Sequence, residues 1–284
     1  MHWHTARFQI DLSRPRVMGI VNLTPDSFSD GGQYSTAQAG IAHCHRLVEQ
    51  GADVLDLGAE SSRPGALTLT IDEEWGRLAP VLAQAVKLGV PISIDTCKPE
   101  VMSRALAAGA DIINDIHALE RPGALDTVLA TRAGVCLMHM RGEPQTMQGL
   151  ADYEDVVAEV TRYLGARLQA VQDAGMAPDR VVLDPGYGFA KTSEHNLALL
   201  RRQAELLGLG RPMLAGLSRK RMLGDLTGKP PGERVAASVA AALLALQRGA
   251  SLIRVHDVSE TVDALKVWMA VSENRAQISK EHKQ

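Results

Sequence analysis

Short apolar runs that end in polar residues recur along the chain. The first run, residues 17–21, ends at Asn22 and leads into a segment rich in Thr, Pro, Asp, Ser and Gly. A continuous apolar run of this length is typical of a strand buried on both faces, and the segment after it is typical of a long loop. In α/β proteins the chemistry is found where such strands end.

The same unit is repeated through the rest of the chain. We expect seven more strands, over residues 54–58, 92–96, 111–115, 135–138, 181–184, 213–216 and 252–257. Apolar residues at helical spacing between them predict helices over 36–50, 71–88, 123–133, 153–174 and 258–272, among others. The polar stretch 1–15 predicts a short N-terminal strand or hairpin that covers one end of the fold.

This alternation predicts an α/β protein made of one (β/α)₈ TIM barrel. We expect a single domain over residues 1–284, with its core at about 16–272 and a frayed tail from Lys280. A doubly wound open sheet fits less well, because no Gly-x-Gly-x-x-Gly follows the first strand. In a barrel all the strands end on one face, so one pocket should be surrounded by Asn22, Asp95, Asn114, Asp184, Lys220, Arg254 and His256.

Composition and charge narrow the class of protein. A net charge of −3 gives no support to binding of nucleic acid or of an acidic membrane surface. The longest apolar run, about 235–246, is too short to span a bilayer, and the N-terminus lacks the pattern of a signal peptide. Cys44, Cys97 and Cys136 are scattered and read as reduced thiols. We therefore predict a cytoplasmic protein that acts on small molecules.

Acidic and amide side chains at the strand ends suggest a ligand rich in N–H groups. A single Asp such as Asp95 or Asp184 is as often a helix cap or a structural ion-pair partner. Several barrel strands that end in Asp or Asn shift the balance, and two carboxylates near Asn114 suit a nitrogen heterocycle. Met138, after the fifth strand, is expected either to line the pocket or to pack beside it.

Basic side chains follow the last two strands, where barrels commonly bind phosphate. Arg254 can grip a phosphate through two parallel hydrogen bonds, with Lys220 and His256 beside it. The alternative is that Arg254 pairs with Asp257 or Glu260 at the rim.

Asn22 adds a candidate metal ligand to this end of the barrel. Its amide oxygen, together with phosphate oxygens and water, would suit Mg²⁺, which rarely occupies a cage made only of protein ligands.

These segments resemble the signatures of a known family. Met18–Gly32 resembles the first signature of bacterial dihydropteroate synthases, and Gly58–Ala66 resembles the second. Further matches occur in the family's order and bring the coverage to about residues 16–271: Ser93–Thr96, Ile113–Asp115, Asp184–Phe189, Ser218–Lys220 and Arg254–His256. The full set is far more specific than any one of its members.

The resemblance implies a transferase of folate biosynthesis. It would join p-aminobenzoate to 6-hydroxymethyl-7,8-dihydropterin diphosphate, giving 7,8-dihydropteroate and diphosphate. The implied catalytic residues are Asp95, Lys220, Arg254 and His256. The implied pterin-binding residues are Asp95, Asn114, Asp184, Lys220 and Met138. The diphosphate would be held by Mg²⁺ at Asn22 and by Asn22, Ser62, Arg63, Arg254 and His256. The p-aminobenzoate would be held by Ser61, Ser62, Pro64, Phe189, Ser218, Lys220 and Arg221.

The resemblance also implies a homodimer formed through barrel helices, and a p-aminobenzoate slot in which sulfonamide drugs compete. The chain departs from the family pattern at Ser62, Tyr187, Ala190 and Arg221. Two alternatives remain. One is a methyltetrahydrofolate-binding barrel of the corrinoid methyltransferase type, which needs no phosphate cluster. The other is a protein that binds a pterin or a phosphate without catalysis.

Overall fold

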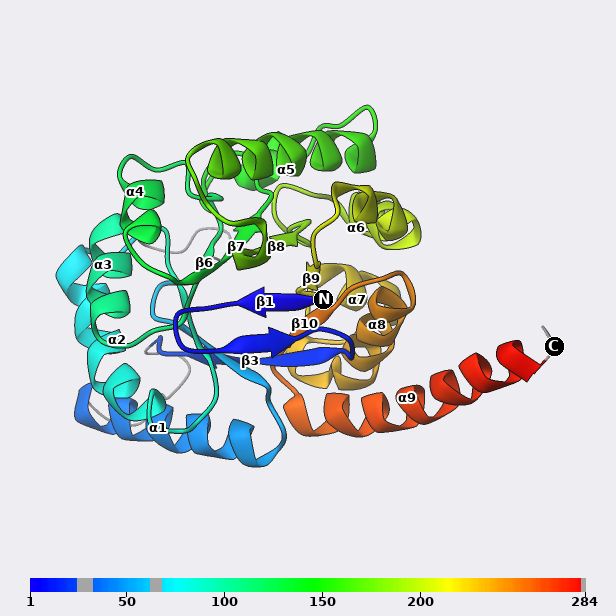
Figure 1. Cartoon of the computed structure of the whole chain (residues 1–284), viewed down its shortest axis with the longest axis horizontal. Helices are drawn as coiled ribbons and strands as arrows, with labels where there is room; N and C mark the ends of the chain where they lie inside the picture. Colours follow the sequence, from blue (N-terminus) through cyan, green and yellow to red (C-terminus); the bar gives the residue numbers. More distant parts are fainter. Residues whose placement is uncertain (25–32, 62–67, 282–284) are drawn as a thin grey trace.

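Eight parallel strands form a nearly closed barrel with helices around its outside, as predicted (Figure 1). The computed structural model describes residues 1–24, 33–61 and 68–281. The strand order is β8-β7-β6-β5-β4-β3-β10-β9, and a backbone bridge between Leu183 and Met213 links the two ends. The strands are β3 Arg16–Asn22, β4 Val54–Gly58, β5 Ile92–Asp95, β6 Ile112–Asp115, β7 Gly134–Met138, β8 Val181–Asp184, β9 Leu214–Ala215 and β10 Leu252–Val255.

The helices follow the strands in the chain. They are α1 Gln33–Glu49, α2 Ile71–Ala85, α3 Pro99–Ala107, α4 Ala124–Leu129, α5 Val156–Asp173, α6 Ser193–Arg202, α7 Arg221–Thr227, α8 Val235–Gln247 and α9 Val258–Glu281. Short 3₁₀ helices lie at η2 Met147–Leu150, η3 Pro178–Arg180, η4 Gln203–Leu209 and η5 Pro231–Glu233. The local sequence explains where several of these helices begin. Thr70 and Glu73 form a capping box on α2, and Asp155 caps α5.

Two helix predictions were wrong at their ends. The helix expected over 123–133 stops at Leu129, and Thr131 Oγ1 accepts a hydrogen bond from the backbone of Ala133 beyond it. The last helix continues past Ser272, its expected end, to Glu281. Residues 273–281 contain neither Gly nor Pro to stop a helix.

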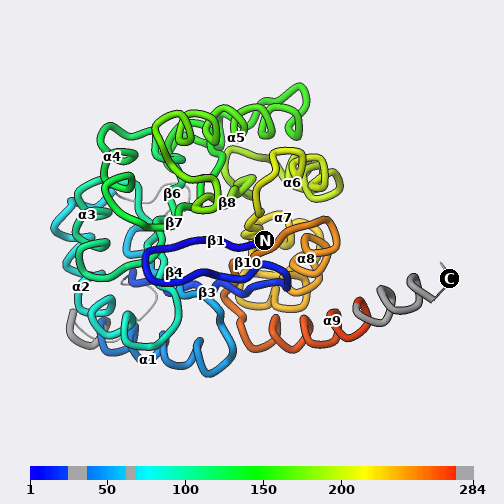
Figure 2. Tube along the Cα trace, viewed as in Figure 1, coloured from blue at the N-terminus to red at the C-terminus, as the bar shows by residue number. Residues whose placement is uncertain are grey.

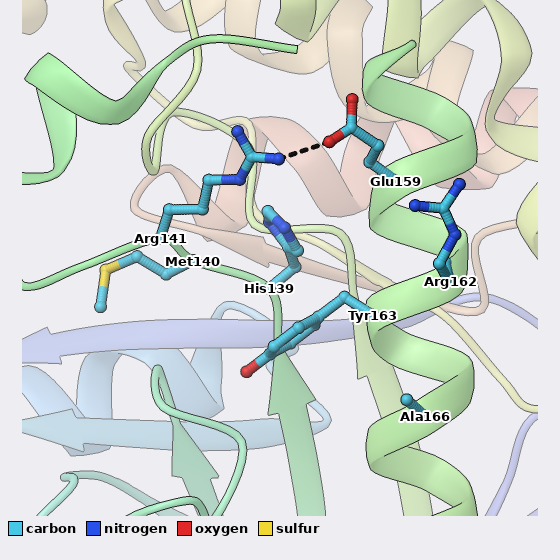
Figure 3. A pocket seen from close by; sticks show the side chains of 7 residues that line it. All are labelled: His139, Met140, Arg141, Glu159, Arg162, Tyr163 and Ala166. Carbon is cyan, nitrogen blue, oxygen red and sulfur yellow. Dashed lines mark hydrogen bonds and ion pairs between the residues drawn. The ribbon is translucent and has the colours of Figure 1, made fainter. Parts of the chain in front are cut away.

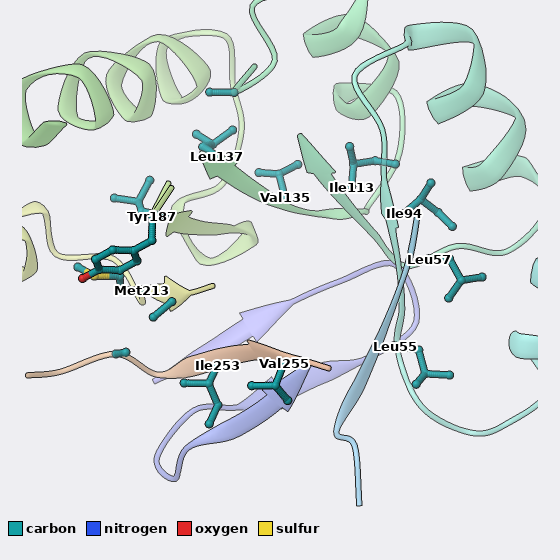
Figure 4. Packing of buried hydrophobic residues seen from close by; sticks show 14 of the residues in the cluster. Leu55, Leu57, Ile94, Ile113, Val135, Leu137, Tyr187, Met213, Ile253 and Val255 are labelled. Atoms are coloured by element: carbon teal, nitrogen blue, oxygen red, sulfur yellow. The ribbon is translucent and has the colours of Figure 1, made fainter. Parts of the chain in front are cut away.

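Alternation along each strand separates two packing layers. Outward residues of the strands pack against the helices, and they include Leu55, Leu57, Ile94, Ile113, Val135, Leu137, Ile253 and Val255 (Figure 4). Inward residues fill the lower part of the barrel, and they are Met18, Val54, Ile112, Cys136, Val182, Leu214 and Leu252. Because side chains alternate, the residues two and four positions further along a strand also face inward, toward the carboxyl ends.

The predicted N-terminal hairpin closes the other end of the barrel (Figure 2). Strands β1 His2–His4 and β2 Gln9–Asp11 pair antiparallel, with Trp3 opposite Ile10. Trp3 is fully buried against the inward layer, and its indole Nε1 donates a 2.9 Å hydrogen bond to the Arg180 carbonyl. The hairpin therefore seals the interior from below and leaves the carboxyl end open to a ligand.

Two further expectations concern the whole chain. In the part of the chain that the structure describes, no helix is long and apolar enough to cross a membrane. Cys44, Cys97 and Cys136 are buried free thiols.

Candidate active site at the carboxyl ends of the strands

Register brings the predicted polar residues to one level of the barrel. Asp95 of β5 is paired with Asn114 of β6 and with Gly58 of β4, and Gly58 is paired with Asn22 of β3. Met138 of β7 is likewise paired with Asp184 of β8. Residues from distant parts of the chain thus meet at the open end of the barrel.

An acid–arginine cluster occupies the centre of this end. Arg254 donates from Nε to Asp56 Oδ2 at 2.6 Å and from Nη2 to Asp95 Oδ2 at 2.8 Å. Asn114 Nδ2 donates to the same Asp56 oxygen at 3.2 Å. We call these four residues, Asp56, Asp95, Asn114 and Arg254, the central cluster. It merges the acidic and basic groups that the sequence had suggested as two separate halves.

The rim pairing considered for Arg254 is wrong. Asp257 is bonded instead to Arg219, through Nε at 3.1 Å and through Nη2. Arg254 lies on the inward side of β10 with Asp56 and Asp95, whereas its neighbour Val255 faces the helices. The inward direction of Arg254 on β10 therefore decides that it meets Asp56 and Asp95 instead of Asp257.

Asp56 is the member of the cluster that was missed among the candidate residues. It lies in the middle of an apolar strand instead of at its end, and its side chain is fully buried. The signal was present, because an Asp flanked by Leu55 and Leu57 is costly to bury without partners. Its Oδ1 atom is buried and has no hydrogen-bond partner among the described residues, so this oxygen can accept a hydrogen bond from a ligand.

Burial perturbs the carboxyl group of Asp95. Loss of solvent raises its pKa to about 7, and the carboxylate of Asp56 adds to this shift while Arg254 opposes it. A carboxyl group that titrates near neutrality inside a polar pocket is typical of functional sites.

Asp184 and Lys220 form the opposite wall. Asp184 Oδ1 accepts a 2.7 Å hydrogen bond from the Gly186 amide, and burial raises the pKa of its carboxyl group. Burial and the nearby Arg254 lower the pKa of Lys220 to about 8. Lys220 Nζ lies 4.2 Å from the centre of the Phe189 ring, a cation–π distance.

A glycine makes room for this lysine. A Cβ atom at Gly188 would lie 2.9 Å from Lys220 Cδ, and Gly188 has a φ of 83°. The loop after β8 can therefore approach Lys220 only with glycine at this position.

His256 is held by Ser218 across the end of β10. Ser218 Oγ lies 3.0 Å from His256 Nδ1 and accepts a 3.2 Å hydrogen bond from the His256 amide. Burial and the nearby arginines lower the pKa of His256 to about 3, so its ring is neutral at physiological pH.

The remaining predicted residues are not all in view. Ser62, Arg63 and Pro64 lie outside the described residues, and Ser61 is half-buried at the edge of that gap. The Arg221 side chain, at the start of α7, is 89% exposed and lies 3.8 Å from Asp225.

Two departures from the family pattern lie in the loop after β8. Tyr187 faces the helices, where its hydroxyl donates to Gln203 Oε1 at 2.8 Å (Figure 4). This residue can therefore affect the site only through packing. Ala190 is buried beside Met138, Met140 and Met147.

A second hollow lies outside the barrel, between the end of β7 and α5 (Figure 3). Its volume is about 360 Å³, and it is lined by His139, Met140, Arg141, Glu159, Arg162, Tyr163 and Ala166. Arg141 and Glu159 form an ion pair there. None of the central cluster residues lines this hollow.

Known proteins share this arrangement along nearly the whole chain. Residues 18–256 match the family described as pterin binding enzyme. The chain is 53% identical over 280 residues to a dihydropteroate synthase of Neisseria meningitidis, covering 96% of this chain and 98% of that protein. The chain belongs to the dihydropteroate synthase family.

Solved structures of the family have the same fold. A Xanthomonas albilineans dihydropteroate synthase with 4-aminobenzoic acid is 53% identical, with a TM-score of 0.91 and coverage of 96% and 99% of the two chains. A structure of the enzyme from that organism with 7,8-dihydropteroate gives 51% identity, a TM-score of 0.88 and coverage of 96% and 99%. A Yersinia pestis dihydropteroate synthase in a sulfonamide drug complex gives 43% identity, a TM-score of 0.91 and coverage of 96% and 100%.

Proposed function

We propose that this chain condenses p-aminobenzoate with 6-hydroxymethyl-7,8-dihydropterin diphosphate to give 7,8-dihydropteroate and diphosphate. The observation that carries the proposal is the central cluster at the open end of the barrel, in which the guanidinium of Arg254 donates to two carboxylates and the amide of Asn114 donates to one of them. Membership of the dihydropteroate synthase family supports it.

The acidic groups would hold the pterin. Its ring carries several N–H donors, and Asp56 Oδ1 is a buried acceptor that has no partner in the part of the chain that the structure describes. Asp95, Asn114 and Asp184 surround the same space, with Lys220 and Met138 at its edge. The methyltetrahydrofolate-binding alternative shares this acidic pocket, but it gives no reason for the basic groups beside it.

Arg254, His256 and Asn22 would hold the diphosphate, together with Ser62 and Arg63. Two carboxylates fix Arg254 through its Nε and Nη2 atoms. Its Nη1 group would then donate to an anion. If the Ser218 hydroxyl donates to His256 Nδ1, the neutral ring carries its proton on Nε2 and can donate it to a phosphate oxygen.

Magnesium fits this end of the barrel through the oxygen chemistry of Asn22. Among the described residues no group of three His, Cys, Asp or Glu side chains could hold a metal, which suits an ion bound mainly by substrate and water oxygens. When bound, Mg²⁺ would neutralise charge on the diphosphate.

The chain's own residues would then stabilise both sides of the breaking bond. The C–O bond breaks with its electron pair moving to the diphosphate, whose growing charge Arg254 stabilises. The positive methylene carbon left on the pterin is stabilised by the ionised carboxylate of Asp95. The amine of p-aminobenzoate forms the new C–N bond and releases a proton, with positioning supplying most of the remaining acceleration.

The p-aminobenzoate would lie between the loop after β8 and the start of α7. Phe189, Ser218 and Lys220 form this edge among the described residues, with Arg221 next to Lys220 in the chain. By resemblance to the family, Ser61, Ser62 and Pro64 would complete the slot. The family structures that contain 4-aminobenzoic acid and a sulfonamide drug support this slot and its inhibition by sulfonamides.

Release of diphosphate tests the proposal. We would incubate the purified protein with the pterin diphosphate and Mg²⁺, with and without p-aminobenzoate, and repeat the assay with chelator, Asp95→Asn and Arg254→Ala. Release should require both substrates and the metal, and it should fall sharply in both variants. Pterin binding without release would support the methyltransferase-like or non-catalytic alternatives and would overturn the synthase.

We also propose that the protein acts in the cytoplasm as a homodimer. Its buried free thiols suit a reducing compartment. Leu226 of α7 and Leu244 of α8 are large apolar side chains exposed on neighbouring helices, as expected of an interface between copies. Sedimentation of the wild type and of Leu226→Glu tests the dimer, and a wild type that sediments as a monomer would contradict it.

A further inference from the structure

A buried lysine, Lys191, lies behind the loop that joins β8 to α6, and the proposed reaction gives it no role. The residue is only 3% exposed. Its Nζ atom lies 3.0 Å from the Gly186 carbonyl, 2.9 Å from the Phe189 carbonyl and 3.4 Å from the His139 carbonyl. Its fourth contact is His139 Nδ1, at 2.9 Å.

Burial and the nearby cations lower the pKa of His139 to about 2, so its ring is neutral. All four contacts are acceptors when this neutral ring carries its proton on Nε2. Burial also lowers the pKa of Lys191 itself. An ammonium group offers three protons to these four acceptors, whereas a neutral amine would turn its own lone pair toward one of them. With the His139 proton on Nε2 these contacts suit a charged lysine, and with that proton on Nδ1 they suit a neutral one. In both cases Nζ donates to the backbone carbonyls.

The loop that this lysine contacts has an unusual backbone. Gly186, Gly188 and Ala190 all have positive φ angles, of 68°, 83° and 48°. Left-handed geometry at Ala190 costs about 1–2 kcal/mol, so contacts with the rest of the protein must hold the loop in this shape. Asn196 assists from the other side, since its Oδ1 accepts a 2.7 Å hydrogen bond from the Gly188 amide.

The same loop touches the site at three points. The Gly186 amide bonds Asp184, Gly188 packs against the Lys220 side chain, and the Phe189 ring lies under the Lys220 ammonium. Two of the three carbonyls that Lys191 binds belong to this loop, and the third belongs to His139 after β7. Lys191 thus ties the loop to the barrel wall directly behind the residues that face the substrate.

We propose that Lys191 is a positioning residue whose buried Nζ group holds the loop 185–192 so that Phe189 and Lys220 form the p-aminobenzoate slot. The effect on p-aminobenzoate binding rests on the proposed function. The effect of Lys191 on the shape of the loop does not depend on it. Removal of the Lys191 Nζ group leaves three carbonyls without the donor that they share. The left-handed segment of the loop can then relax, because these hydrogen bonds no longer hold it.

The experiment compares two variants that each remove a cation bonded to backbone carbonyls. Lys191→Met keeps the length of the side chain and removes its donors. The matched control is Arg180→Met, because Arg180 donates to the Ala133 and Val128 carbonyls, at 2.8 and 3.0 Å, at the opposite end of the barrel. The measurements are amide hydrogen exchange of peptides covering 185–196 and KM and kcat for each substrate.

In Lys191→Met we expect faster exchange over 185–196 and a KM for p-aminobenzoate raised by about tenfold or more, equivalent to about 1.4 kcal/mol. The KM for the pterin diphosphate and the behaviour of Arg180→Met should stay near wild type. The proposal would be overturned if amide exchange over 185–196 stayed unchanged in Lys191→Met. It would also be overturned if Lys191→Met and Arg180→Met raised the KM for p-aminobenzoate equally. If Lys191→Met does not fold, Lys191→Gln is judged by the same two readouts. A wild type without turnover would refute the proposed function, whereas exchange would still decide the role of Lys191 in the loop.

Discussion

Arg254 Nε and Asp56 Oδ2 lie 2.6 Å apart, although 198 positions of the chain separate the two residues. The contact joins β10 to β4 across the inside of the barrel, and Asp95 holds a second edge of the same guanidinium. The arginine is therefore oriented by protein carboxylates before a ligand arrives. Preorganised charge of this kind is more effective in catalysis than charge that must reorient during the reaction.

Replacement of Asp56 by Asn tests this relationship. Asn keeps the shape but removes the charge that faces Arg254 and weakens the acceptor proposed for the pterin. A hydrogen bond to a charged group contributes about 1.5–3 kcal/mol, so kcat/KM for the pterin diphosphate should fall by roughly ten- to a hundredfold. Steady-state kinetics measure the effect, and wild-type kcat/KM in this variant would argue against the assignment.

The pH dependence should reflect two perturbed groups. Asp95 must ionise to stabilise a positive pterin carbon, so kcat/KM should rise with pH through its pKa of about 7. Loss of the Lys220 proton should lower activity above its pKa of about 8. Lys220→Arg stays charged and should lose the alkaline decline.

The raised pKa of Asp95 also has a consequence for stability. Between its ordinary value of 3.8 and about 7, the folded state binds more protons than the unfolded state. The contribution of this group to the free energy of unfolding therefore falls as pH rises through that range. Urea unfolding of wild type and Asp95→Asn at several pH values measures it, and parallel pH profiles for the two proteins would contradict the shift.

Gly216→Ala should separate binding from folding. A Cβ atom there would have Asp184 Oδ2, at 4.0 Å, as its nearest neighbour. The added methyl group would occupy space beside a carboxylate assigned to the pterin, and it would clash with none of the residues that the structure describes. We expect a free energy of unfolding within about 0.5 kcal/mol of wild type and a clearly higher KM for the pterin diphosphate. An unchanged KM would place the pterin elsewhere.

Gly186 and Gly210 form a matched pair, since both have a φ of 68°. A Cβ atom at Gly186 would lie 2.0 Å from the His139 carbonyl oxygen, whereas at Gly210 it would meet nothing within 4 Å. Gly210→Ala should lower the free energy of unfolding by about 1–2 kcal/mol, because alanine disfavours the left-handed backbone conformation. Gly186→Ala should cost clearly more. Equal losses in urea unfolding would show that the loop after β8 can move away from β7.

Trp3→Ala should destabilise the barrel without touching its site. The indole is fully buried under the inward layer, and removal of a buried Trp costs about 3–5 kcal/mol. Trp3→Phe loses mainly the Nε1 hydrogen bond to Arg180 and should cost less. Thermal unfolding measures both. A severe loss of kcat in the folded Trp3→Phe protein would contradict a purely structural role.

The sequence determined the barrel and most of the polar groups at its open end. Apolar runs such as 17–21 are typical of strands buried on both faces, as in a parallel sheet. Several of them end at a residue that proved to face inward, such as Asn114 and Asp184. Local chemistry also predicted the N-terminal hairpin. These features depend on neighbours in the chain, which is why a pattern can reveal them.

Only the tertiary structure decided which charges meet. Nothing local pairs Arg254 with Asp56 instead of Asp257, or brings the His139 carbonyl to Lys191. Those partners come from strands and loops distant in sequence, and the register of the barrel brings them together. The pKa values of Asp95 and Lys220 follow from the same cause, because burial and neighbouring charge exist only once the barrel has closed.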